Sequence, residues 1–244
     1  MFNQFAVHSW FENLDRGEGE AKDYIHIHFL PARVKRGWAW QIPITDTITS
    51  VGVVAEKEIF VEGKYDQEGW FNDLAASNEN LAHALRDAKP VKPFKSEADY
   101  SYVMSRFVGD GYMLIGDAAR FVDPIFSSGV SVALESAKMA SETIQKALAE
   151  GDVSRETLMA YETQMRSGVE VWYEFIKVYY KCLPLFTYFI QNKEYRLGLL
   201  QLLQGEVFNR DAVPVLDKMR AYVESIESAD NHMLKPQLAE DIVI

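Results

Sequence analysis

A short apolar run followed by an acidic turn and a long helix constrains the fold of this chain more than any other feature. Residues 112–115 read Tyr-Met-Leu-Ile, an unbroken run typical of a strand buried on both faces, and Gly116 and Asp117 follow at once. Between residues 130 and 147, apolar and small side chains recur every three or four positions, which predicts a helix that ends at Gly151. The sequence therefore predicts a strand-to-helix crossover with Asp117 where ligands of α/β sheets usually bind.

The rest of the chain predicts an α+β fold class. Apolar and polar residues alternate along four segments, which indicates an antiparallel meander of strands within residues 1–60. These segments are 4–12, 23–30, 37–44 and 49–55. The polar, glycine-containing segment 15–20 is expected to form a hairpin loop between the first two strands. Helical spacing follows at 67–77 and 80–88, and Ser154 is expected to cap a second long helix.

Charge and cysteine content exclude several classes of protein. The chain has 25 basic and 36 acidic residues, a net charge of −11, so a nucleic-acid partner is not expected. Cys182 is the single cysteine; it can form no internal disulfide, and a reducing, cytoplasmic location is expected. The first residues show no secretory signal, and charged residues and a proline interrupt the apolar segment 171–190, so membrane contact is not expected.

Three histidines are candidate metal ligands. His8, His26 and His28 fall on predicted strands, and His26 and His28 share a face at a spacing that suits a metal. Since no cysteine and no Glu-x-x-His motif accompanies them, no metal site is predicted.

The crossover carries two features that suit a reduced flavin. The carboxylate of Asp117 can accept hydrogen bonds from the hydroxyls of a polyol such as the ribityl chain. Ser128 and Gly129 begin the helix, where unpaired N–H groups and the positive end of the helix dipole favour the negative charge of a reduced flavin ring. Gly129 is expected to permit close approach to that ring, because it has no side chain. The alternative is that Asp117 merely caps the turn.

Two motifs resemble known flavoproteins. The string Gly-Asp-Ala-Ala at 116–119, followed by Pro124 and Gly129, resembles the second flavin motif of FAD-dependent oxidoreductases of the aromatic hydroxylase type. Residues 37–43, with Trp38 and Trp40, resemble the Trp-x-Trp-x-Ile-Pro signature of flavin-dependent halogenases. The resemblance implies a set of FAD-binding residues, namely Gly116, Asp117, Ala118, Pro124, Ser128, Gly129 and Val130.

The halogenase resemblance also implies a halide site and a substrate channel. The halide would rest on the backbone N–H groups of Ser128 and Gly129, while Trp38, Trp40 and Phe126 would line the channel. The alternative for the tryptophans is a core pair under a helix. Phe126 stands where tryptophan halogenases have a glutamate, and so resembles halogenases of phenols or of pyrroles tethered to a carrier protein. The aromatic-rich segment 172–189 would close over the active site or pack helices together.

Part of the family pattern is absent from this sequence. No Gly-x-Gly-x-x-Gly precedes a helix, and the catalytic lysine of halogenases belongs to the same N-terminal region, so no catalytic residue is predicted in this chain. A truncated, split or cut chain is expected, with a separately encoded N-terminal half as a possible partner. Alone, the chain is expected to bind FAD weakly or not at all.

The sequence thus predicts a fragment of an FADH2-dependent halogenase that chlorinates an electron-rich aromatic and receives reduced FAD from a separate flavin reductase. Another FAD-dependent monooxygenase or reductase, and a non-catalytic remnant or binding module, are the alternatives. The expected domains are the substrate-side antiparallel sheet with helices (1–98), the second FAD motif in a Rossmann-like fold (99–151), a helical region (152–227) and a loose tail (228–244).

Overall fold

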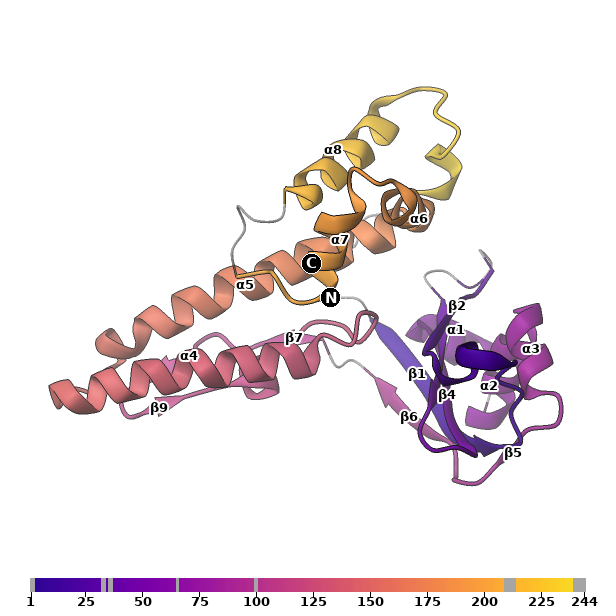
Figure 1. Ribbon diagram of the computed structural model, residues 1–244, viewed down its shortest axis with the longest axis horizontal. Helices are drawn as coiled ribbons and strands as arrows, with labels where there is room; N and C mark the ends of the chain where they lie inside the picture. The colour runs from indigo at the N-terminus through magenta and orange to yellow at the C-terminus, as the bar shows by residue number, and fades with distance from the viewer. Residues whose placement is uncertain are drawn as a thin grey trace. The chain divides into compact units, whose positions relative to one another are not determined.

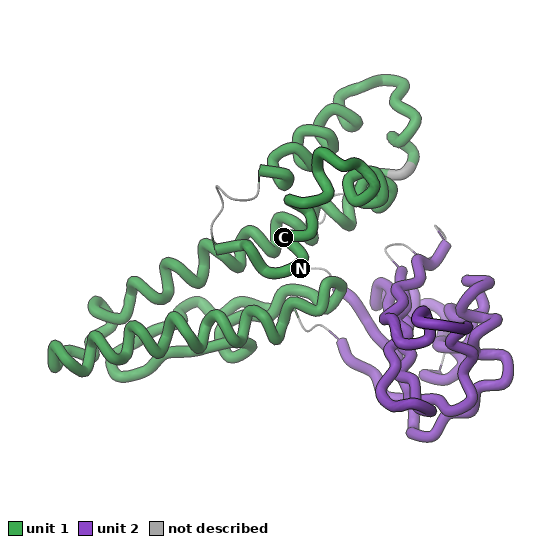
Figure 2. Tube along the Cα trace, in the orientation of Figure 1, with its two compact units in different colours: residues 1, 101–244 green, residues 2–100 purple. Residues whose placement is uncertain are grey.

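The computed structural model describes residues 3–31, 34, 37–64, 66–98, 101–208 and 214–238. The chain divides into two compact units, residues 2–100 and residues 101–244 with residue 1 (Figure 2). The expected boundary at 98/99 lies beside this division, and the three expected segments from 99 onward belong to one unit. That finer division stays a prediction, and residues 239–244 of the expected tail lie outside the described residues.

The first unit contains an antiparallel sheet in the order β2-β3-β4-β1-β5, with β6 also paired to β1. Its strands are β1 (Gln4–Glu12), β2 (His26–Phe29), β3 (Trp38–Pro43), β4 (Ile48–Glu56), β5 (Lys89–Pro90) and β6 (Lys95–Ala98). The expected hairpin between the first two strands is wrong, because β1 pairs with β4, so that Ala6 lies opposite Val54. Burial explains this order: β1 is buried along most of its length and takes a central place, whereas the half-exposed β2 takes the edge.

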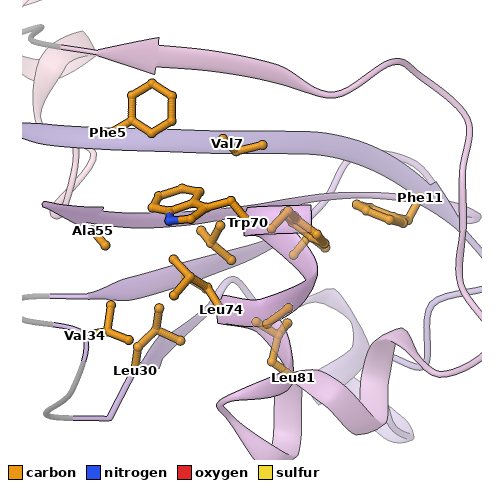
Figure 3. Packing of buried hydrophobic residues seen from close by; sticks show 14 residues of the cluster. Phe5, Val7, Phe11, Leu30, Val34, Ala55, Trp70, Leu74 and Leu81 are labelled. Atoms are coloured by element: carbon orange, nitrogen blue, oxygen red, sulfur yellow. The ribbon is translucent and has the colours of Figure 1, made fainter. Parts of the chain in front are cut away.

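Three helices cover one face of this sheet: α1 (Lys57–Gly63), α2 (Gln67–Ala76) and α3 (Glu79–Leu85). Side chains cap the two predicted helices, since Asp66 accepts from the N–H of Gly69 at 2.7 Å and Asn78 from that of Leu81 at 3.0 Å. Trp70 and Leu74 of α2 pack onto Phe5, Val7 and neighbouring strand residues (Figure 3). These residues form the hydrophobic core of the unit.

The second unit is dominated by helices: α4 (Gly129–Glu150), α5 (Arg155–Lys181), α6 (Leu183–Gln191), α7 (Arg196–Leu203) and α8 (Val215–Ser228). The two long helices α4 and α5 lie side by side (Figure 1). Both predicted boundaries are confirmed: Gly151 ends α4 at φ +69°, and Ser154 caps α5 by accepting from the N–H of Thr157. Among the described residues, no helix is long and apolar enough to cross a membrane.

Short extended pieces precede α4: β7 (Tyr102–Val103), β8 (Val108–Gly109), β9 (Tyr112–Met113) and β10 (Arg120–Phe121), with the 3-10 turn η2 (Gly116–Ala118). The expectation that residues 112–115 form a strand buried on both faces is wrong. Tyr112 is 49% exposed and Ile115 44% exposed. Within the described part of the chain, β9 pairs only with β8, so no further strand shields this run from solvent.

Candidate functional site

The turn at Gly116 and Asp117 packs against the first turns of α4. The N–H of Gly116 donates to Oγ of Ser136 at 2.9 Å. Gly116 has φ +51°, and a Cβ there would lie 3.1 Å from the Cβ of Ala133. A left-handed, closely packed position of this kind favours glycine. The structure therefore brings the acidic turn to the beginning of the helix, as the sequence predicted.

Asp117 presents its carboxylate to the surface. The residue is exposed, and none of the described residues hydrogen-bonds to its side chain. Its backbone carbonyl accepts a hydrogen bond from the hydroxyl of Tyr102, which fixes the turn. Ala118 is exposed as well, whereas Ala119 is fully buried. The carboxylate is thus held in place by its backbone and is free to bind hydroxyl groups of a ligand.

The loop that enters α4 has an unusual backbone. Ser127 has φ +52°, and its N–H donates to the carbonyl of Pro124 at 2.9 Å. Ser128, the N-cap, returns to the right-handed region at φ −75°. A left-handed residue followed by a right-handed one turns successive N–H groups toward a common concavity, which is an anion-binding arrangement. Because the first N–H groups of a helix have no intrahelical partner, those of Ser128 and Gly129 suit an anion.

The remaining predicted residues at the start of α4 differ in exposure. Ser128 is buried, Gly129 and Pro124 are half-buried, and Val130 is 72% exposed. A Cβ at position 129 would meet only Phe121, at an ordinary contact distance of 3.4 Å. The packing of the described residues therefore does not require a glycine at 129, and a ligand on the open side remains the reason expected from the sequence.

Asp123 precedes Pro124 in the same loop, and the sequence does not predict that its side chain is buried. Its Oδ1 accepts from the N–H of Ile125 at 2.9 Å and from the hydroxyl of Tyr180 at 3.1 Å. The side chain is 1% exposed, and Oδ2 has no hydrogen-bond partner. Burial raises the pKa of Asp123 to about 7, although the hydrogen bonds from Ile125 and Tyr180 act in the opposite direction. The residues around Asp123 in the sequence give no signal of this raised pKa.

Phe126 lies in a cluster of aromatic rings. Its ring stacks on Phe175 at a centroid distance of 4.7 Å and meets Tyr179 edge-on at 4.9 Å. Phe186 and Trp172 complete the cluster at 5.9 Å and 6.4 Å. The segment 172–189 therefore packs onto the loop at Phe126, and the lining of a substrate channel by Phe126 stays a prediction.

Trp38 and Trp40 belong to the sheet unit and share one face of β3. Ala39 between them lies in the core with the helices, so both tryptophans lie on the opposite face of the sheet. Trp40 covers Gly52, where a Cβ would come within 2.2 Å of the ring, and its Nε1 donates to Oγ of Ser50 at 3.1 Å. This placement disfavours the alternative of a pair under a helix.

The histidines of β2 show no metal-binding arrangement. Nε2 of His28 lies 3.2 Å from Oε1 of Gln41, and burial lowers the pKa of His28. Across the described ranges, no group of three His, Cys, Asp or Glu side chains is placed to hold a metal ion.

Comparison with known proteins identifies the family. The family model for tryptophan halogenase matches residues 31–188. This chain belongs to the tryptophan halogenase family. A 1H-pyrrole-2-carbonyl-[peptidyl-carrier protein] chlorinase of Pseudomonas fluorescens is 50% identical over 98% of this chain and 54% of its own length. The corresponding brominase of Pseudoalteromonas luteoviolacea is 31% identical over 70% of this chain and 42% of its own length.

Solved structures agree with this assignment. A flavin-dependent brominase superposes with a TM-score of 0.83 at 27% identity, over 92% of this chain and 56% of that chain. The chain thus has the α+β architecture of an FAD-dependent halogenase, as predicted, and spans about half the length of the curated relatives it matches.

Proposed function

We propose that this chain forms part of an FADH2-dependent halogenase that chlorinates a pyrrole ring tethered to a carrier protein. The observation that supports this most is the packing of the Gly116–Asp117 turn on α4, which leaves the carboxylate of Asp117 exposed beside the start of the helix. The 50% identical relative is named as a chlorinase of carrier-bound pyrrole-2-carbonyl, and its name supplies the substrate class.

The residues present fit a flavin. The Asp117 carboxylate would bind the ribityl hydroxyls, while Gly116, Ala118, Pro124 and Val130 would lie along the cofactor. The N-terminus of α4 would stabilise negative charge on the ring, by up to about 2 kcal/mol where partly buried. Reduced FAD would supply two electrons to dioxygen, and the net reaction is R–H + Cl⁻ + FADH2 + O2 + H⁺ → R–Cl + FAD + 2 H2O.

The loop before α4 would hold the halide. The change from left-handed Ser127 to right-handed Ser128 directs the N–H groups of Ser128 and Gly129 to one side, and the N–H of Ser127 is already occupied by Pro124. An anion there gains hydrogen bonds and the favourable helix dipole without a basic side chain.

The substrate assignment favours pyrrole over indole. Phe126 supplies no carboxylate for ring chlorination, and its ring packs against the buried rings of Phe175 and Tyr179, which makes this part of the loop apolar. A phenol suits the same chemistry, and the names of the two relatives favour the tethered pyrrole.

We propose that a protein segment corresponding to the other half of the relatives' length packs on this chain. One face of α4 exposes Val130, Leu134, Ile144 and Leu148 at 72%, 68%, 41% and 66%. Their helical spacing places all four on the side away from the buried residues, with Ala137 and Ser141 between the two apolar pairs. We expect a half with the Gly-x-Gly-x-x-Gly turn and the catalytic lysine, on the same or a separate polypeptide, to cover this face. Reduced FAD would come from a flavin reductase.

The test combines this chain with that half, FADH2, chloride and a pyrrole-2-carbonyl carrier protein. A chlorinated product that requires chloride supports the proposal, whereas an oxygenated product formed without halide indicates a monooxygenase. Asp117→Ala is expected to reduce FAD affinity at least about tenfold, because it removes hydrogen bonds to the cofactor. Glu142→Gln, at an exposed position of α4, is the matched control. Absence of flavin binding by the combined halves would leave the non-catalytic alternative.

A further inference from the structure

The carboxyl group of Asp123 connects the loop before α4 to helix α5. Oδ1 of Asp123 accepts one hydrogen bond from the N–H of Ile125 in this loop and one from the hydroxyl of Tyr180 on α5. The next hydrogen bond along the loop joins the N–H of Ser127 to the carbonyl of Pro124, and Ser127 itself is left-handed. Asp123 thus joins the first part of the loop 124–129 to α5.

We propose that Asp123 is a positioning residue that holds the loop 124–129 as a neutral carboxylic acid, and that ionisation of Asp123 weakens halide binding at Ser128 and Gly129. This inference rests on the proposed function, because it concerns the same halide site.

The surroundings of Oδ2 favour the neutral form. The atom is buried and has no hydrogen-bond partner, and Asp123 is 1% exposed. The titratable groups that face it are Tyr179 and Tyr180 of α5, and none of the described Lys, Arg or His side chains forms an ion pair with it. A buried anionic oxygen without a partner is strongly disfavoured, which is why burial raises the pKa of Asp123 to about 7.

The sign of the effect on a halide follows from charge. A neutral acid leaves the anion to interact with the helix dipole and the loop N–H groups alone. An ionised Asp123 in the same turn opposes a second anion, and two like charges within one partly buried turn weaken binding by about tenfold or more. Halide affinity is therefore expected to fall as the pH rises through about 7.

The experiment measures chloride binding directly, by line broadening of the chlorine nuclear magnetic resonance signal that bromide reverses. It uses the chain completed by the half proposed above, at pH values from about 5.5 to about 8.5, on both sides of the raised pKa. Wild type is expected to lose about tenfold in chloride affinity across this range. Asp123→Asn, which stays neutral and keeps an oxygen acceptor, is expected to remove the pH dependence while retaining affinity. Asp152→Asn, an exposed aspartate of the same unit, is the matched control.

A second variant keeps the proposal testable if Asp123→Asn does not fold. Tyr180→Phe removes a hydrogen bond that lowers the pKa of Asp123, so the midpoint of the chloride titration is expected to move to higher pH. An unchanged midpoint in Tyr180→Phe, or an unchanged pH profile in Asp123→Asn, would overturn the inference.

Infrared spectroscopy separates failure of this inference from failure of the proposed function. A band of a protonated buried carboxyl group, absent in Asp123→Asn, is expected in wild type below the raised pKa. Absence of that band overturns the role of Asp123 and leaves halogenation standing. If the band is present and wild type binds no displaceable chloride, the halide site and the proposed function fail together.

Discussion

Replacing Glu162 with glutamine tests how the hairpin that leads to Asp117 is held. Oε2 of Glu162 accepts from the N–H groups of Phe107 and Val108 at 2.9 Å and 3.2 Å, and Oε1 pairs with Arg166 at 2.7 Å. Arg166 also donates to the carbonyls of Met104 and Ser105. Glu162 and Arg166 together thus join α5 to the segment 104–108.

The cost of Glu162→Gln can be estimated from these contacts. Hydrogen bonds to a charged group contribute about 1.5 to 3 kcal/mol, against about 1 kcal/mol between neutral groups. The Glu162 side chain is 7% exposed, whereas that of Arg166 is 36% exposed and remains partly solvated, which reduces the loss of the ion pair. We expect the free energy of unfolding to fall by about 2 to 3 kcal/mol.

Urea unfolding of this chain, followed by circular dichroism at neutral pH, measures that loss. Glu170→Gln is the matched control: the Glu170 side chain is 52% exposed and pairs with Arg120 at 3.3 Å, so a change below about 1 kcal/mol is expected. Equal effects of the two substitutions would refute the reasoning.

The pH dependence supplies a second check on Glu162. Burial alone raises its pKa, but the hydrogen bonds from Arg166, Phe107 and Val108 outweigh burial and lower the pKa in the folded state. A carboxyl group of this kind contributes stability above its unfolded pKa of about 4.3, and that contribution is lost as the pH falls through the folded pKa. The gap between wild type and Glu162→Gln is therefore expected to narrow in acid, and a constant gap would contradict this account.

Three further outcomes are expected from unfolding and dye-binding measurements. Gly116→Ala forces a Cβ into a left-handed, closely packed position and should cost about 1 to 2 kcal/mol of unfolding free energy by urea titration. Asp123→Asn should gain thermal stability relative to wild type as the pH rises from about 4 to about 7. Over this range the unfolded wild type releases the Asp123 proton while the folded wild type retains it, which lowers the stability of wild type alone. Equal melting curves at all pH values would contradict this. This chain alone should strongly bind a dye that reports apolar surfaces, through the exposed apolar residues of α4. Weak dye binding would count against a further protein segment that covers these residues.

The helices of this protein were largely predictable, because their signals are local. Period and capping residues placed α4 and α5, and the end at Gly151 and the cap at Ser154 agree with the structure. The packing of the Gly116–Asp117 turn on α4 followed from the same local logic, since the short crossover between residues 117 and 129 returns the chain to the helix.

The order of the strands was not predictable in the same way. Alternation along a strand shows that it has two faces, but it does not say which strand lies beside it. The pairing of β1 with β4 is long-range, and the burial of both faces of β1 became evident only once its neighbours were known. The burial of Asp123 is of the same kind, because the hydroxyl that it meets comes from Tyr180, far along the chain.

Helix α4 explains why the candidate site looks open in this chain. Its buried residues face α5 and the turn at Gly116, yet Val130, Leu134 and Leu148 on the other side are each more than half exposed. A helix with apolar residues on two sides usually lies between two layers. Ile115 and Tyr112, exposed where a doubly buried strand was expected, give the same indication for the segment before the helix. The start of α4, where we propose the flavin and halide sites, therefore belongs to a layer that we expect a further protein segment to cover.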